Sequence, residues 1–234
     1  MKLKQEVSLK WYNILWLRHT ISYKFSYNTN KIEGSTLSED DTRDIFHNNS
    51  LLGSGQINID DIIEMKNQLS MFDYMLDIAE DTLTEEIIKK FHSILKTNTS
   101  DEKKDWFNVG EYKKLANTVG GRDTTAPKDV EYEIKRLLEN YNKKNKIKIE
   151  DIIQFHFEFE KIHPFQDGNG RVGRMIMFKE CSKHSIVPFI ILDDIKQYYY
   201  RGLSEFTKEK GYLMDTCLAA QDEYMEMVEK FLGA

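Results

Sequence analysis

The sequence predicts an all-α fold in one globular unit, residues 1–234, with a small β-hairpin as its β structure. Only three prolines and twelve glycines occur, and residues 1–33 and 212–232 contain neither. A chain so rarely interrupted, and rich in Lys, Glu and Leu, favours helices. Apolar residues make up 40% and charged residues 31% of the chain, which is the balance of an ordinary soluble domain.

The N-terminal half predicts a series of helices. One helix is indicated around residues 11–17, and a second covers residues 23–33 and stops at Gly34, a residue suited to the left-handed position after a helix. Ser38, followed by Asp41, is typical of a helix start. Helical spacing returns over residues 62–78, and Thr84 begins a further amphipathic helix.

Residues 105–127 differ from the rest because they concentrate turn-forming residues. Gly110, Gly120, Gly121 and Pro127 surround short runs near residues 115–119 and 124–126. A β-hairpin turning at residues 120–123 is the best interpretation. Helical patterns resume over residues 130–141 and near residue 149.

The segment FHFEFE, residues 155–160, alternates like a strand, but its wider surroundings favour a helix. Ile152, Phe155, Phe159 and Ile162 recur at helical intervals. Pro164 disfavours helical backbone in the residue before it, so this helix must end near residue 163. The helical pattern restarts at Val172, which predicts a polar, glycine-rich loop between two helices.

The composition of the chain argues against several classes of protein. The net charge of −6 argues against a nucleic-acid-binding protein, which normally has a basic surface. Cys181 and Cys217 lie in apolar helical patterns, so we expect two buried thiols rather than a disulfide. The sequence shows neither a signal peptide nor an apolar run of membrane-spanning length. We therefore expect a cytoplasmic protein that does not bind a membrane.

The loop contains the features of an anion site. Gly168 and Gly170 flank the start of the second helix, where free backbone N–H groups and the positive helix end favour a phosphate. Arg171 and Arg174 are three residues apart, so both guanidinium groups can face one anion.

The same loop supplies a metal ligand and a base. Asp167 is placed to hold Mg²⁺, which prefers one or two carboxylates together with phosphate oxygens. His163 lies at the end of the preceding helix and titrates near neutral pH. These parts together are those of a phosphoryl or nucleotidyl transferase.

Two other interpretations compete. Residues 168–173 also match the dinucleotide-binding pattern G-x-G-x-x-G, and Asp193 follows at a suitable distance. That pattern requires a buried strand before its first glycine, where this chain has a polar loop after a helix. Alternatively, His163 is an ordinary core histidine and the arginines form a solvated face. The concentration of these residues in one short loop argues against that interpretation.

The loop sequence HPFQDGNGRVGR, residues 163–174, resembles the Fic-family motif HxFx(D/E)GNGRxxR at every fixed position. The resemblance implies an all-α bundle with a hairpin called the flap. The catalytic core would cover residues 86–186 with the flap at 110–127, and C-terminal helices would cover residues 187–234. It also implies Mg²⁺-dependent transfer of AMP from ATP to a protein hydroxyl.

The resemblance assigns individual roles. His163 would deprotonate the target hydroxyl, Asp167 would bind Mg²⁺, and Phe165 would anchor the loop. Tyr199 would flank the adenosine, but Thr207 stands where some relatives have an adenosine-contacting Asn, so the purine contacts are less specified than the phosphate contacts. The implied nucleotide-binding residues are Gly168, Asn169, Gly170, Arg171, Arg174 and Tyr199, with Asn117, Thr118, Val119 and Gly120 in the flap.

Residues 29–34, TNKIEG, resemble the family's inhibitory motif (S/T)xxxE(G/N). A carboxylate in the last turn of a helix faces the negative end of the helix dipole, and a locally unfavourable placement is typical of function. Residues 22–34 would form the inhibitory helix, with Thr29 and Glu33 as its motif residues. Glu33 would pair with Arg174 and displace the γ-phosphate of ATP.

The resulting prediction is a protein AMPylator that modifies a Tyr, Thr or Ser hydroxyl of a target protein and of itself, and that Glu33 inhibits. Two alternatives stay open on the same scaffold, namely hydrolytic removal of AMP and transfer of another phosphorylated group. A third alternative, of a different class, is an inactive nucleotide-binding or toxin-like interaction module. The expected partners are ATP and a protein substrate, and oligomers are compatible with the sequence.

Overall fold

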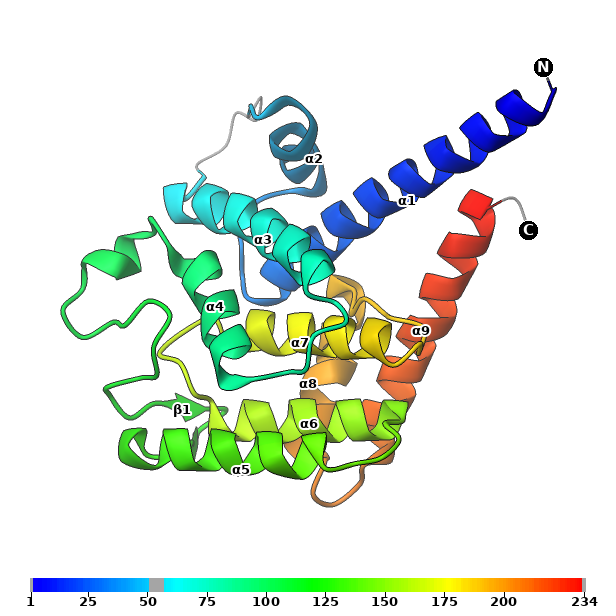
Figure 1. Cartoon of the computed structure of the whole chain (residues 1–234). Helices are drawn as coiled ribbons and strands as arrows, with labels where there is room; N and C mark the ends of the chain where they lie inside the picture. Colours follow the sequence, from blue (N-terminus) through cyan, green and yellow to red (C-terminus); the bar gives the residue numbers. More distant parts are fainter. Residues whose placement is uncertain (1, 51–56, 233–234) are drawn as a thin grey trace.

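The chain is helical throughout, as the sequence predicts (Figure 1). The computed structural model describes residues 2–50 and 57–232. In these ranges the α-helices are α1 (Lys2–Ile32), α2 (Glu39–Asn48), α3 (Ile59–Asp77), α4 (Glu85–Lys96), α5 (Val130–Asn142), α6 (Ile149–Ile162), α7 (Asn169–Lys183), α8 (Lys196–Glu205) and α9 (Gly211–Leu232). Short 3₁₀ turns cover η1 (Ser100–Lys103), η2 (Pro127–Asp129) and η3 (Asp193–Ile195).

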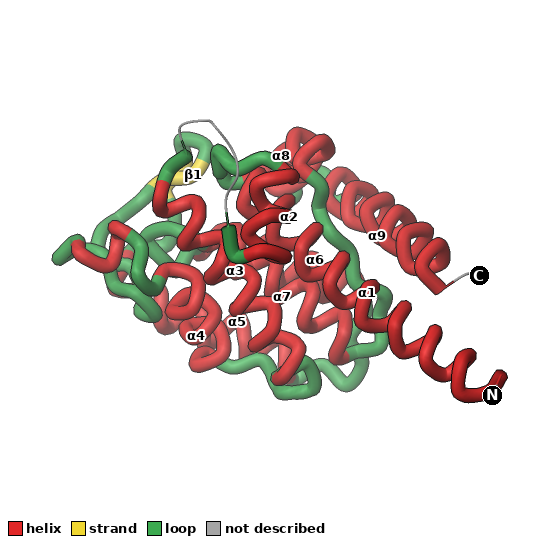
Figure 2. Tube along the Cα trace, turned by 90° about the horizontal axis from the view of Figure 1, so that it is seen from above, coloured by secondary structure: helices red, strands yellow, loops and turns green. Residues whose placement is uncertain are grey.

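Helix α1 is one continuous helix, so the expected division into helices around residues 11–17 and 23–33 is wrong. Neither Gly nor Pro separates those two stretches, and nothing else in the sequence between them ends a helix. The predicted stop is confirmed, because Gly34 adopts the left-handed conformation at φ +93° directly after the helix. Figures 1 and 2 show the first part of α1 extending beyond the body of the protein on the side where α9 ends.

The predicted helix starts agree with the observed caps. The Ser38 hydroxyl accepts a hydrogen bond from the Asp41 N–H at 3.1 Å, and the Asp41 carboxylate accepts one from the Ser38 N–H at 3.0 Å. This reciprocal capping box begins α2. The Thr84 hydroxyl caps α4 by accepting from the Ile87 N–H at 3.4 Å.

Helix α7 is the centre of the molecule. Twelve of its fifteen residues are buried, because α1, α3, α4 and α6 all pack against it. Figure 1 shows α7 between α3 and α4 on one side and α6 on the other, and Figure 2 shows the same bundle from above. A helix buried all round is a rigid platform, so residues at its N-terminus are held by the whole core.

The connection between α6 and α7 follows the prediction with one difference. Helix α6 ends at Ile162, and His163 takes the left-handed conformation at φ +51° before Pro164. Helix α7 begins at Asn169, three residues earlier than the Val172 expected from apolar spacing. The start lies earlier because Gly168, at φ +80°, turns the chain directly into the helix.

The expected hairpin is present but shorter. Strand β1 (Thr118–Val119) pairs antiparallel with β2 (Arg122–Asp123), and Gly120 and Gly121 form a two-residue turn with φ values of +55° and +76°. Two successive positive φ values are typical of the type I′ turn that suits a tight hairpin. Because all four strand residues are exposed, this segment projects from the bundle rather than joining its core.

Two further expectations can be compared with the structure. Cys181 and Cys217 are both buried free thiols, as predicted. Within residues 2–50 and 57–232, no helix is both long and apolar enough to cross a lipid bilayer.

Candidate active site

The loop between α6 and α7 is held by its own side chains. The Asn169 amide accepts a hydrogen bond from the Phe165 N–H at 2.8 Å and donates one to the Phe165 carbonyl at 2.9 Å. The Phe165 ring is fully buried and stacks on His92, with ring centroids 4.0 Å apart. Since both polar atoms of Asn169 bond the loop, only its backbone N–H is left for a phosphate.

The N-terminus of α7 lies where the sequence predicts an anion cradle. The first N–H groups of a helix have no partner within it, and Gly168 has no side chain with which to cap them. Gly170 lies against the carboxylate of Glu33, and a Cβ on residue 170 would collide with Glu33 Oε1. The carboxylate of Glu33 therefore lies at the cradle, where an anion is favoured.

Arg174 is bound by the end of α1. Its Nη2 lies 2.6 Å from Glu33 Oε1 and donates to the Thr29 carbonyl at 2.9 Å, while its Nε donates to the Thr29 hydroxyl at 2.7 Å. The guanidinium group is almost fully buried. The structure thus brings together Thr29, Glu33 and Arg174, three residues that the sequence analysis selected.

Arg171 points elsewhere. Its guanidinium group pairs with Glu64 of α3, and its Nη2 lies 3.0 Å from Asp167 Oδ2. It also donates to Asn30 Oδ1 at 3.4 Å. In this structure the two arginines face different carboxylates, so the expectation that both face one anion is not met.

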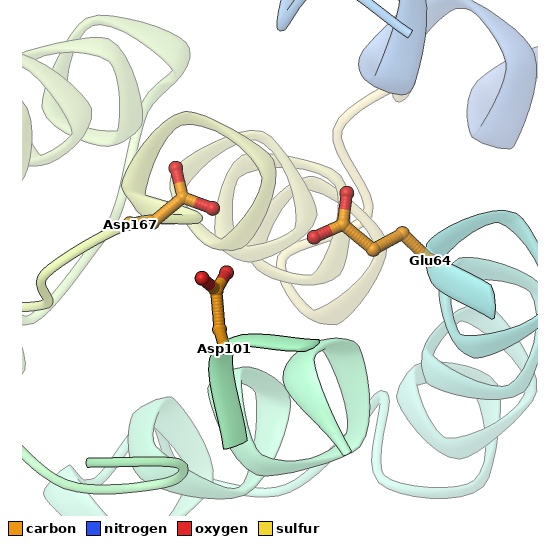
Figure 3. A group of neighbouring side chains, drawn as sticks. All are labelled: Glu64, Asp101 and Asp167. Carbon is orange, nitrogen blue, oxygen red and sulfur yellow. The ribbon is translucent and has the colours of Figure 1, made fainter. Parts of the chain in front are cut away.

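Three carboxylates, from α3, η1 and the loop, converge beside Arg171 (Figure 3). One oxygen from each of Glu64, Asp101 and Asp167 lies within 4.8 Å of the others. The Lys96 ammonium contacts all three, including Asp167 Oδ2 at 2.8 Å. Lys96 and Arg171 already offset much of this negative charge, so the cluster as a whole does not resemble a metal cage.

Asp167 on its own fits the Mg²⁺ assignment better than the cluster does. Its side chain is half exposed, with 50% of its surface accessible. Although burial of the carboxyl raises its pKa, Arg171 and Lys96 outweigh that effect and hold the pKa of Asp167 well below its usual range. An ionised, accessible carboxylate beside an anion cradle is a suitable ligand for Mg²⁺ that arrives with a nucleotide.

His163 lies at the edge of the cradle in its neutral form. Burial, together with the positive charge of Lys113, lowers the pKa of its imidazole to about 4. A neutral imidazole can accept a proton at physiological pH, as a general base must.

Tyr199 does not occupy the position expected for an adenosine contact. Its side chain is 1% exposed, its hydroxyl lies 2.7 Å from His156 Nε2, and Arg174 Nη1 donates to it at 3.5 Å. The helical spacing of α8 turns this ring into the core beneath Arg174. In this structure Tyr199 supports Arg174, and Tyr200, whose hydroxyl donates to the Ile32 carbonyl at 2.7 Å, is the more exposed neighbour.

The flap is fastened to the loop through Asn117. The Asn117 amide donates to the Phe165 carbonyl at 3.2 Å, and its Oδ1 accepts from Lys113 at 2.7 Å and from the Thr124 hydroxyl at 2.6 Å. These bonds make Asn117 a brace at the base of the flap. Thr118, Val119 and Gly120 are exposed, so their backbone is accessible to a partner.

Sequence reasoning missed five residues of this site: Glu64, His92, Lys96, Asp101 and Lys113. His92 accepts a hydrogen bond from the Gly110 N–H at 2.9 Å and stacks on Phe165, so it joins the start of the flap to the loop. A polar residue on the apolar face of α4 was the available signal for His92 and Lys96. Charged residues are common on helix surfaces and in loops, so nothing in the sequence distinguished Glu64 of α3 or Lys113 in the loop before β1.

Comparisons with known proteins agree with the motif. A model of the Fic/DOC family matches residues 82–181. The chain is 24% identical over 186 residues to protein adenylyltransferase fic-1 of Caenorhabditis elegans, covering 77% of this chain and 36% of that protein. It is 23% identical over 188 residues to protein adenylyltransferase Fic of Nematostella vectensis, covering 78% of this chain and 43% of that one. The chain therefore spans well under half the length of these curated relatives.

Solved structures show the same fold. A Fic-domain-containing signaling protein from Bacteroides thetaiotaomicron superposes with a TM-score of 0.82 at 22% identity, covering 100% of this chain and 97% of the other. Fic-1 from Caenorhabditis elegans superposes with a TM-score of 0.75 at 18% identity, covering 94% of this chain and 65% of the other.

Proposed function

We propose that this protein, whose residues 82–181 match a model of the Fic/DOC family, transfers AMP from ATP to a hydroxyl side chain of a protein. The observation that supports this function most is the juxtaposition of His163 with the free N-terminus of a buried helix. That helix end would hold the α-phosphate, where negative charge develops as the hydroxyl attacks. Curated relatives named protein adenylyltransferases support the same reaction.

Each part of the site has a role in this proposal. His163 removes the proton of the target hydroxyl, and the backbone of residues 168–170 binds the α-phosphate. Arg174 binds the terminal phosphates once it is released from α1, and Asp167 holds Mg²⁺, which neutralises phosphate charge when bound. The exposed flap strand at Thr118 and Val119 aligns the target segment by strand addition.

We further propose that Glu33 inhibits the reaction. Its carboxylate lies 2.6 Å from Arg174 Nη2 and against Gly170, so it occupies space and charge that a terminal phosphate needs. ATP that enters while Glu33 is in place lacks the Arg174 contact and binds in an unproductive pose. Removal of the carboxylate releases Arg174 for the nucleotide.

The first experiment identifies which part of ATP is transferred to the protein. Purified wild-type protein and the Glu33→Gly variant are incubated with Mg²⁺ and ATP labelled in either the α- or the γ-phosphate. We expect protein labelled by α-³²P but not by γ-³²P, and an intact-mass increase of one AMP. Incorporation of γ-label alone would show that the protein is instead a kinase-like transferase.

The inhibitory role of Glu33 is tested in the same assay. Glu33→Gly is expected to raise self-AMPylation at least about tenfold, equivalent to roughly 1.4 kcal/mol of barrier. Glu33→Gly with Arg174→Ala should lose this gain. A matched control is Glu80→Gly, which removes an exposed carboxylate from the turn after α3. Equal transfer by wild type and a folded Glu33→Gly variant would argue against inhibition.

A chase experiment distinguishes inhibition by Glu33 from hydrolytic removal of AMP. Pre-modified protein is mixed with fresh wild-type or Glu33→Gly enzyme without ATP. Loss of AMP only with the wild type would assign Glu33 to a de-AMPylating reaction instead.

A further inference from the structure

Glu160 is a carboxyl group on the last turn of α6 that the proposed reaction has not yet used. Its side chain is 14% exposed and that of His163 is 17% exposed, so both are largely removed from water. Glu160 Oε2 lies 3.9 Å from His163 Nδ1. The two residues are three apart in sequence, and the left-handed backbone of His163 directs its ring toward the preceding turn.

The polar atoms between these groups lack hydrogen bonds. Among the described residues, His163 Nδ1 and Glu160 Oε1 are both buried side-chain atoms without a partner. Unpaired buried polar atoms are costly, and a shift of about 1 Å would bring Glu160 Oε2 within hydrogen-bond distance of His163 Nδ1. Gly173 allows α7 to cover this carboxyl, because a Cβ on residue 173 would lie 2.8 Å from Glu160 Oε1.

We propose that Glu160 is the positioning residue for His163: its carboxylate accepts a hydrogen bond from Nδ1–H, which leaves Nε2 free to act as the base. This inference rests on the function proposed above. The two ring nitrogens of a histidine are not equivalent, and the partner of one decides whether the other can accept a proton.

The hydroxyl proton of the target passes to His163 Nε2 while the hydroxyl oxygen bonds to the α-phosphorus. The bond between the α-phosphorus and the oxygen that bridges to the β-phosphorus breaks, and pyrophosphate leaves with that electron pair. The imidazolium ion donates Nδ1–H to the carboxylate of Glu160, and Nε2 finally releases its proton to solvent.

Several charges surround this pair and determine when it can form. His163 is influenced by Lys113 from the flap, Glu33 from α1 and Asp167 from the loop. Burial and the nearby charge of Glu33 raise the pKa of Glu160 to about 8, although Arg174 opposes the shift. Among the described residues, His156, Tyr199 and Tyr200 are further titratable neighbours of Glu160.

The charge of Glu33 connects the positioning role of Glu160 to the proposed inhibition. The ionised carboxylate of Glu160 accepts from Nδ1–H more strongly than the neutral carboxyl does, so transfer rises with pH through the pKa of Glu160. Withdrawal of Glu33 removes one cause of the raised pKa, so the carboxylate forms at lower pH. Glu33 therefore acts on the base as well as on Arg174.

The first test is the pH profile of self-AMPylation at saturating ATP in the Glu33→Gly background. Glu160→Gln keeps an acceptor but loses the charge, and Glu160→Met loses both. We expect the plateau rate to fall about tenfold for Gln and about a hundredfold for Met, within the usual contribution of a positioned base. In the parent, the rate should start to rise with pH below pH 8. In both variants this rise should lie at still lower pH, because the pKa of His163, about 4, then determines where the rate rises. ATP affinity should not change.

Glu158→Gln is the matched control, since it removes a carboxyl from the same helix that bonds only Gln154 among the described residues; its profile should equal that of the parent. If a Glu160 variant had a lower plateau rate but its rate rose over the same pH range as that of the parent, Glu160 would have a purely structural role and the proposal would be overturned. A shifted rise with an unchanged plateau rate would overturn it as well.

The second test needs no transfer reaction. ¹⁵N NMR of histidine-labelled Glu33→Gly protein at pH 9, with His163→Ala identifying the resonance, reports the tautomer of His163. We expect the Nδ1–H form, and loss of this preference in Glu160→Met. An Nε2–H tautomer, or a tautomer unaffected by Glu160→Met, would overturn the proposal. Because this measurement is independent of AMP transfer, it stands even if α-labelled ATP fails to modify the protein.

Discussion

At the scale of single residues, the two arginines of the loop differ in the carboxylate with which each one pairs. Arg171 and Arg174 are three residues apart on one helix, yet Arg171 pairs with Glu64 and Arg174 with Glu33. Their side chains leave the first turn of α7 toward different neighbours, α3 and α1. One arginine is thus part of a network with Asp167, and the other is held where a change in α1 can release it.

His163 is expected to be essential for transfer but not for nucleotide binding. In the Glu33→Gly background, His163→Ala should reduce self-AMPylation by about 10²–10⁴, because a positioned general base contributes about that factor. Calorimetry with a non-hydrolysable ATP analogue should give an affinity close to that of the parent. His47→Ala, which changes an exposed histidine of α2, is the control. Parent-level transfer by the His163 variant would exclude it as the base.

Thr29 is expected to strengthen inhibition through Arg174. Thr29→Val keeps the shape of the side chain but removes the acceptor for Arg174 Nε. Loss of one such hydrogen bond costs about 1 kcal/mol, so self-AMPylation should rise about fivefold, less than for Glu33→Gly. Ser26→Ala, one turn earlier on α1, is the matched control. A Thr29→Val variant as inactive as wild type would mean that Glu33 alone holds the arginine.

At the scale of elements, the site is built where the ends of three segments meet. The C-terminus of α1 supplies Thr29 and Glu33, the N-terminus of α7 supplies the cradle, and the end of α6 supplies His163. The base of the flap is tied to the same loop by Asn117 and His92. The site therefore depends on how the end of α1 packs against α7, and α1 also contributes Ile21, Phe25 and Ile32 to the core.

Phe165 is the residue that couples these elements, and its removal should affect them together. Its buried ring stacks on His92, which accepts from the Gly110 N–H. Phe165→Ala should lower the free energy of unfolding by about 3–5 kcal/mol, measured by urea denaturation, because it creates a cavity in the core. Hydrogen exchange of the Gly110 N–H should become faster. Phe165→Leu, which keeps most of the apolar volume, should show a smaller effect on both, and a loss below about 1 kcal/mol for Ala would contradict this role.

At the scale of the whole molecule, buried neutral histidines make stability depend on pH. Burial lowers the pKa of both His92 and His156 to about 3, from an ordinary value of 6.5. Between those values the unfolded chain binds protons that the folded protein does not, so the free energy of unfolding falls as the pH falls. Each histidine contributes a slope of about 1.4 kcal/mol per pH unit in the middle of that window.

The contribution of His156 is measured by comparing denaturant unfolding of wild type and His156→Gln between pH 6 and pH 4. The variant should show a shallower pH dependence by about 1.4 kcal/mol per pH unit. His47→Gln, at an exposed position, should retain the wild-type slope. Identical slopes for wild type and His156→Gln would show that His156 is not held neutral in the folded protein.

The sequence by itself determined the helical class, the hairpin and the loop. These features follow from local physics: apolar spacing along one helix face, a capping serine, a proline after His163 and glycines that permit a turn or a phosphate contact. The resemblance to the Fic-family motifs selected Glu33, Thr29 and Arg174, and the structure brings these three residues into contact. Their inhibitory role stays a prediction.

Only the tertiary structure decided which partner each charged or buried side chain meets. Periodicity did not reveal that α1 is continuous, that Tyr199 turns inward beneath Arg174, or that Lys96 lies among three carboxylates. Nor did it place Glu160 beside His163 in a space closed by Gly173. Such contacts join residues from separate helices, and their energies depend on burial and distance. A local pattern specifies the shape of one segment, whereas the packing of helices around α7 determines which charges share a site.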